Sequence, residues 1–186
     1  MSADRRLDLL KALGAQAFAH LNGSLVEHLC RTEALLAEWG APDVVRTAGL
    51  FHAIYGTDGY EPALMDAAAR RTVALAIGDD AEQIVYLYGA CDRDVFHPRI
   101  GTPAQRLFAD RFSGDEYAIS RERLAQLCEI TVANEIELAM GSVSFLDKHR
   151  GDFAGLLGRM AGLVSNAGMR AARRLLAGAG APQYLS

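Results

Sequence analysis

The stretch PDVVRTAGLFHAIYG, residues 42–56, decides how the rest of the chain must be arranged. It is apolar nearly all round from Ala48 to Tyr55, and a helix that is hydrophobic on every side belongs in the centre of a domain. Pro42 suits the first turn of such a helix, where its missing N–H is no loss, and Gly56 ends it. Other secondary-structure elements must pack around a buried central helix, so the elements predicted in the flanking sequence indicate the fold class.

Two further helices are predicted before this stretch. Leucines and alanines recur at steps of three and four over residues 4–21, a pattern typical of a helix that stops at the turn beginning with Asn22. Ser24 is a good N-cap, and Glu27 follows three residues later as in a capping box. The second helix is therefore expected over residues 25–39.

Helical patterns also dominate after the central stretch. They cover residues 66–78, 80–91 and 121–140, and a last helix beginning at residue 145 or 152 carries residues 155–176. Prolines, glycines and charges over residues 93–114 predict a loop with one short helical turn near residues 104–110. No alternating strand pattern of useful length is present. The sequence thus predicts an all-α fold, one compact helical domain over residues 1–186.

Composition and charge exclude several classes of function. Apolar residues make up 51% of the chain and charged residues 23%, which is ordinary for a globular domain, and the net charge of -4 offers no positive field for nucleic acid. No stretch approaches the ~18 continuous apolar residues of a membrane span. The three cysteines form no CxxC pair. These features favour a cytoplasmic protein with no nucleic-acid or membrane partner.

Three polar residues interrupt apolar helical segments and are the main candidates for a functional site. His28 follows the capping box, His52 lies inside the central stretch, and Asp92 closes the helical segment of residues 80–91. A buried polar group without a partner costs roughly 1 to 3 kcal/mol, so each imidazole needs a hydrogen bond or a metal. We expect the three side chains to meet in one pocket.

This set resembles the ligands of the HD-domain superfamily, helical metal-dependent phosphohydrolases in which one helix gives a histidine, the next a His-Asp pair and a later one an aspartate. The resemblance covers residues 24–93, and it implies an HD-domain-like compact helical bundle. His28, His52 and Asp92 match three of the four ligands, but Ala53 stands where the second aspartate belongs. The chain is also similar to a family of small helical proteins with a His-x-x-Gly-Ser/Thr lead and a Gly-Leu-Phe-His-x-Ile-Tyr-Gly-Thr core.

The departure at Ala53 limits the predicted site to one metal. Two imidazoles and one carboxylate form a facial set that suits iron, and also zinc or manganese with water completing the shell. His20 is a fourth candidate ligand, because a turn after it would fold it back toward the same pocket. The alternatives are hydrogen-bonded core histidines and a pocket that holds no metal.

Tyr55, Thr57 and Arg93 are the candidate catalytic residues. Tyr55 and Thr57 follow His52 on a glycine-containing segment, and Arg93 presents a planar fork of donors to an anionic group. The competing interpretations are a plain helix-ending turn and an exposed ion pair of Arg93 with Asp92 or its other acidic neighbour. Asn134 and Glu135 are further polar residues within an apolar segment.

Three functions remain open from the sequence. The first is a metal-dependent enzyme acting on a small-molecule substrate, either a hydrolase of phosphoester or related bonds or an iron-dependent oxygenase. The second is a metal-free enzyme or ligand-binding domain that uses the same pocket. The third is a helical interaction module, because the small residues of the last helix are typical of a surface on which two chains form a homodimer.

Overall fold

The structure, a computed structural model, describes residues 3–21, 23–60 and 63–178, and this part of the chain is mainly helical, as predicted. Its α-helices are α1 (Ala3–Ala12), α2 (Leu25–Glu38), α3 (Asp43–Phe51), α4 (Arg70–Ile77), α5 (Asp79–Ala90), α6 (Arg93–Phe96), α7 (Arg121–Gly141), α8 (Val143–Arg159) and α9 (Asn166–Leu176). Single 3-10 turns cover Ala67–Ala69 and His97–Arg99. The strands are β1 (Ala19–His20), β2 (Gly23–Ser24), β3 (Leu107–Ala109) and β4 (Glu116–Ala118), paired as two antiparallel hairpins.

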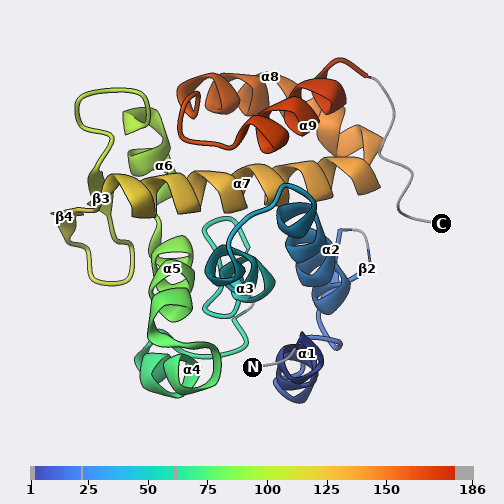
Figure 1. Cartoon of the computed structure of the whole chain (residues 1–186), viewed down its shortest axis with the longest axis vertical. Helices are drawn as coiled ribbons and strands as arrows, with labels where there is room; N and C mark the ends of the chain where they lie inside the picture. The colour runs from blue at the N-terminus through green and yellow to red at the C-terminus, as the bar shows by residue number, and fades with distance from the viewer. Residues whose placement is uncertain (1–2, 22, 61–62, 179–186) are drawn as a thin grey trace.

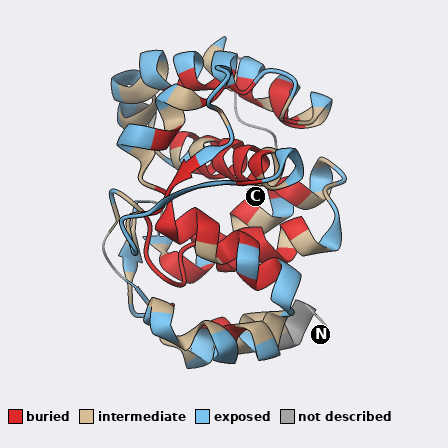
Figure 2. Ribbon diagram, turned by 90° about the vertical axis from the view of Figure 1, so that its left-hand side faces the viewer, coloured by how far each residue is buried: buried red, intermediate tan, exposed pale blue. Residues whose placement is uncertain are grey.

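The long helix α7 crosses the middle of the molecule and separates two groups of helices (Figure 1). Helices α2, α3 and α5 lie on one side of it, and α8 and α9 lie on the other. One cluster of buried apolar side chains extends from Leu10 in α1 to Ala172 in α9. Buried residues gather in the central helices and exposed ones on the outer faces (Figure 2), so any site between α2, α3 and α7 lies deep in the molecule.

Helices α2 and α3 approach each other closely for reasons that are local in sequence. The capping box fixes the start of α2: the Ser24 backbone N–H donates to Glu27 Oε2 (2.7 Å), and Ser24 Oγ accepts from the Glu27 backbone N–H (3.4 Å). A Cβ atom on Gly49 would lie 2.3 Å from Leu36 Cδ1, so a larger residue here would require Leu36 to change rotamer or α2 and α3 to separate. His28 and His52 are thereby carried on two adjoining helices.

The central stretch is buried as predicted, but its regular helix ends earlier. Helix α3 stops at Phe51, and residues 52–55 continue as turns in which the Ile54 N–H donates to Phe51 O (2.9 Å). Gly56, with φ of 74°, reverses the chain direction after them. His52 therefore sits at the C-cap of α3 rather than inside a continuous helix.

Other boundaries also differ from the sequence-based expectation. Helix α1 ends at Ala12 instead of residue 21, because Gly14 adopts a φ of 86° and turns the chain. Residues 107–109 form strand β3 where a helical turn was expected, and α8 and α9 are separate helices joined through Gly162. The two hairpins were not predicted, since strands of two or three residues are too short to show an alternating pattern.

Among the described residues, no helix combines the length and the apolar character needed to cross a membrane.

Candidate metal centre

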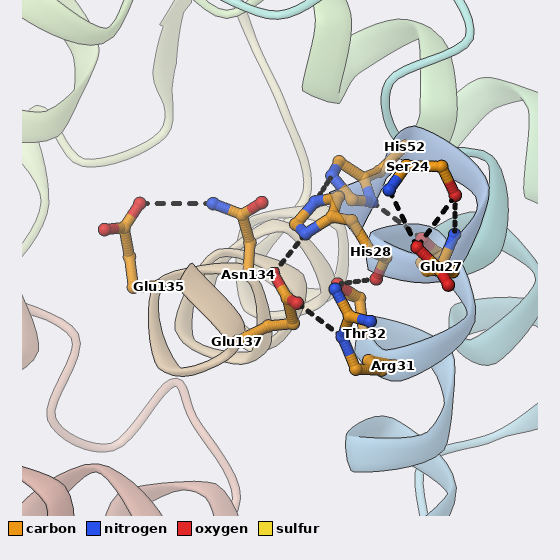
Figure 3. Close-up of polar contacts among 10 residues, drawn as sticks. Ser24, Glu27, His28, Arg31, Thr32, His52, Asn134, Glu135 and Glu137 are labelled. Atoms are coloured by element: carbon orange, nitrogen blue, oxygen red, sulfur yellow. Dashed lines mark hydrogen bonds and ion pairs between the residues drawn. The ribbon is translucent and has the colours of Figure 1, made fainter. Parts of the chain in front are cut away.

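His28 is fixed from two sides. Its side chain projects from α2 toward α7 and is only 1% exposed. Its Nδ1 is hydrogen-bonded to Oε2 of Glu137, and the second oxygen of that carboxylate accepts from Arg31 Nε at 2.7 Å (Figure 3). Burial opposes the charged form of Glu137, but the hydrogen bonds and charges of His28 and Arg31 outweigh it and lower the pKa of Glu137. Because an ionised carboxylate only accepts hydrogen bonds, Nδ1 of His28 carries the hydrogen.

His52 is oriented in the same way by the backbone. Its Nδ1 lies 2.7 Å from the carbonyl oxygen of Gly49, an acceptor, so Nδ1 is again the protonated nitrogen. Burial, followed by the neighbouring His28, lowers the pKa of His52 to about 3, and the imidazole is neutral at physiological pH. The remaining nitrogen, Nε2, therefore presents a lone pair.

The Nε2 atoms of the two rings face each other. His28 Nε2 and His52 Nε2 are 3.3 Å apart, with the rings at 75° (Figure 3). Two nitrogens held at a zinc-like distance of about 2.0 to 2.1 Å in tetrahedral geometry are about 3.3 Å apart, so the observed spacing fits two ligands of one ion. Metal-bound histidines also donate their other ring N–H to a carboxylate or backbone carbonyl, and Glu137 and Gly49 are such acceptors here.

His20 joins this pair through the hairpin β1–β2, which follows α1 and folds the chain back over α2. Its ring stacks on that of His28, with centroids 4.0 Å apart and planes at 22°. Burial, followed by His28, lowers the pKa of His20 to about 4, and its buried Nδ1 has no hydrogen-bond partner among the described residues. One ligand atom each from His20, His28 and Glu137 lie within 4.8 Å of one another. His20 is thus a neutral imidazole grouped with His28 and Glu137, whereas among the described residues His20, His28 and His52 do not form such a group.

These histidines open on a cavity of about 750 Å³ between the α2–α3 side of the molecule and α8. Of the other predicted residues, Thr57 and Arg93 line this cavity, as do Asn134 and Glu135. Helix α8 closes the opposite side with apolar side chains, among them Phe153, and with the polar side chains of His149, Asp152 and Arg159. The cavity is large enough for a small-molecule substrate beside the histidines.

Two predicted site residues lie elsewhere. Asp92 does not line the cavity, because its carboxylate caps α6 by accepting the Val95 N–H at 3.1 Å. Tyr55 points to the other side of the central stretch and donates its hydroxyl hydrogen to Glu82 at 3.0 Å. The structure therefore brings together His20, His28 and His52 but not Asp92.

Glu137 is a site residue that the sequence pattern did not single out. Only Asn134 and Glu135 were candidates in the apolar segment of α7, although Glu137 lies three residues from Asn134 and so on nearly the same helical face. A carboxylate 3% exposed within a run of isoleucine, leucine and alanine is itself a signal of a buried polar partner.

Comparison with known proteins adds one match. Residues 9–93 match a family described as a domain of unknown function (DUF6817). The matched segment includes His20, His28 and His52 and ends before α7, which carries Glu137. No curated protein and no solved structure matched the chain.

Proposed function

We propose that the chain is a single-metal enzyme of HD-domain-like fold that hydrolyses a small molecule in this cavity. The observation that carries the proposal is the 3.3 Å approach of His28 Nε2 to His52 Nε2 while both Nδ1 atoms donate to acceptors. The neutral His52 offers a lone pair at Nε2, and its spacing from His28 Nε2 suits two ligands of one cation. His20 supplies a third nitrogen from the stacked ring.

The donor set favours zinc and hydrolysis over iron and oxidation. Asp92, the carboxylate that would complete a two-histidine facial iron site, is engaged at the start of α6. Glu137 has both oxygens occupied by His28 and Arg31 and acts as a positioning residue. His28 and His52 are imidazole nitrogen donors of the kind that zinc binds, His20 lies against His28, and zinc lowers the pKa of a water that it binds to about 7.

A metal-free enzyme is the second candidate, supported by the pairing of Glu137 with His28. A carboxylate that orients one ring nitrogen of a histidine leaves the other to act as a general base. In that version, His28 would exchange a proton at Nε2 with His52 or with a ligand in the cavity.

Elemental analysis of the purified full chain separates the two candidates. We expect about one zinc ion per chain, lost after His52→Gln and retained after His149→Gln, which changes a histidine that lines the same cavity from α8. Circular dichroism of each variant controls for folding. A folded wild-type chain that stays metal-free after incubation with zinc, iron or manganese would overturn the metal proposal and leave the second candidate.

A further inference from the structure

Arg93 and Glu135 are oppositely charged side chains of the cavity that do not pair with each other. Arg93 begins α6, and its position is fixed because its backbone N–H donates to Asp58 Oδ2 at 2.9 Å. Its guanidinium lies over the Tyr88 ring, 5.3 Å from the centroid, and makes no hydrogen bond or ion pair with another described side chain. Five N–H donors are therefore directed at the cavity or its walls.

Glu135 faces the same cavity from α7. Its Oε1 accepts from Asn134 Nδ2 at 3.2 Å, while its Oε2 has no partner among the described residues. Burial raises the pKa of Glu135, although Arg93 acts in the opposite direction. Burial likewise opposes the charge of Arg93, but Tyr88 and Glu135 among others outweigh it, and the pKa of Arg93 lies above its ordinary value. The two groups are thus near enough to interact electrostatically and too far apart to bond.

A partly buried charge without a partner costs free energy. A ligand that carries one negative and one positive group can pair with both side chains at once and so compensate both charges. Arg93 matches a carboxylate, which its planar fork can bind in bidentate fashion. Glu135 matches an ammonium group, because a cation restores the ionised form that burial disfavours. A doubly charged phosphate fits less well, since the other charged side chains that line the cavity are two acids, Asp58 and Asp152, against one base, Arg159.

We propose that the cavity binds an amino acid-like zwitterion, with its carboxylate on Arg93 and its ammonium group on Glu135. Phe145, Phe153 and Leu156 of α8 provide apolar surface for the rest of the molecule. The inference rests on the proposed function only in treating this ligand as the substrate, because the binding itself does not require the metal.

Calorimetric titration of the full chain with matched probes tests this inference. Glycine, β-alanine and γ-aminobutyrate vary the distance between the two charges, and acetate, propionate and butyrate are the same acids without the amine. We expect at least one amino acid to bind about tenfold more tightly than its parent acid, as one charge-assisted hydrogen bond implies. Equal affinities in all three pairs, or tighter binding of the matched hydroxy acids, would overturn the inference.

Two variants test which charged end of the ligand each side chain binds. Glu135→Gln should abolish the preference for the amino acid without weakening the binding of the parent acid, whereas Arg93→Gln should weaken both about tenfold or more. Glu122→Gln, on the exposed first turn of α7, is the matched control. An unchanged preference in Glu135→Gln would contradict the proposal.

Zinc content measured on the same samples keeps this test separate from the proposed function. Zinc retained in both variants, together with loss of the amino acid preference in Glu135→Gln, supports the inference. A zinc-containing wild type without any preference overturns the inference alone. A metal-free wild type that still prefers the amino acid overturns only the metal proposal.

Discussion

Two buried polar networks lie on either side of the central stretch, and they differ in whether their hydrogen-bonding groups are satisfied. In the structural network, Glu82 Oε1 accepts from the Tyr55 hydroxyl (3.0 Å) and from Arg70 Nε (2.8 Å), and Oε2 accepts from Arg70 Nη2 (2.8 Å). Arg70 also stacks on the Tyr86 ring, 3.8 Å from its centroid. Both carboxylate oxygens of Glu82 and the Tyr55 hydroxyl thus have partners within the chain.

The histidine cluster, His20, His28 and His52, has the opposite character. Two of its ring nitrogens face each other, and the Nδ1 of His20 has no partner among the described residues. The cluster also borders the 750 Å³ cavity, whereas Tyr55 and Glu82 do not. A satisfied network stabilises the fold, while a buried network that lacks partners indicates that a ligand supplies them. We therefore expect substitutions in the structural network to change mainly the stability of the fold, and substitutions in the histidine cluster to change mainly metal binding.

The largest loss of stability should follow Glu82→Ala. The glutamate side chain is 5% exposed, and its removal leaves the buried Tyr55 hydroxyl and the Arg70 guanidinium without their acceptor. We expect the free energy of unfolding to fall by about 3 kcal/mol, with the zinc content per folded chain unchanged. Urea denaturation and elemental analysis measure the two quantities.

His52→Gln is the substitution in the histidine cluster that corresponds to Glu82→Ala in the structural network. It removes the hydrogen bond to Gly49 O and the contact with His28 Nε2, and in metal-free protein we expect a loss of about 1 kcal/mol together with loss of zinc binding. Equal stability losses in the two variants would contradict the distinction between the networks.

Gly49→Ala should have the next largest effect and alters both properties. The added methyl group would lie 2.3 Å from Leu36 Cδ1, so α2 and α3 must separate or Leu36 must change rotamer. Overpacking of this kind destabilises by about 2 kcal/mol, and a wider spacing of His28 and His52 should weaken zinc binding. Gly151→Ala on α8, where the new methyl group meets nothing within 4 Å, is the control. Unchanged zinc affinity in Gly49→Ala would show that the helix spacing does not set the site.

The sequence predicts that His28 and His52 meet, but it does not predict which other side chains lie beside them. His28 and His52 were expected to meet because capping residues and apolar periodicity place them on consecutive helices, and the structure puts their Nε2 atoms 3.3 Å apart. Asp92 was expected with them, but the residues after it start a new helix, and its carboxylate caps that helix instead. Local pattern indicates which residues are buried, whereas the direction of a side chain at an element boundary depends on the conformation of the next segment.

Glu137 and the position of His20 show a second limit of prediction from the sequence. Helix α7 is buried on most of its surface, so periodicity alone does not tell which polar residue of its central segment faces α2. His20 was expected at the end of a long first helix, yet α1 ends early near Gly14. Instead, His20 lies in strand β1, which pairs with β2, and its ring stacks on the ring of His28. Both facts depend on tertiary packing, which a local sequence pattern does not encode.

Acidification should destabilise the histidine cluster more than the structural network. The pKa values of His52 and His20 are lowered to about 3 and about 4, below the ordinary value of 6.5 that applies in the unfolded chain. The unfolded chain therefore binds more protons, and stability falls as the pH decreases from about 6.5 toward about 4. Between about pH 6 and pH 5, His52 should account for about 1.2 kcal/mol per pH unit.

Denaturation of chelator-treated protein across this range measures that slope. His52→Gln should reduce it by the share of one histidine. A slope that is the same in wild type and His52→Gln would contradict the neutral, buried state of that imidazole.

Ser24→Ala should have the smallest effect and tests how the start of α2 supports the histidine cluster. The Ser24 hydroxyl accepts the Glu27 N–H one turn before His28, and loss of such a cap costs about 1 kcal/mol. If the cap only stabilises the helix end, zinc affinity stays at the wild-type value and urea denaturation shows the whole effect. Because β2 carries Ser24 and pairs with the strand that holds His20, we instead expect zinc binding to weaken about threefold as well. Ser120→Ala, which removes the equivalent cap of α7, matches the loss of helix capping without touching the hairpin. Similar zinc affinities in the two variants would separate the hairpin from the site and leave His28 and His52 as its only positioned imidazoles.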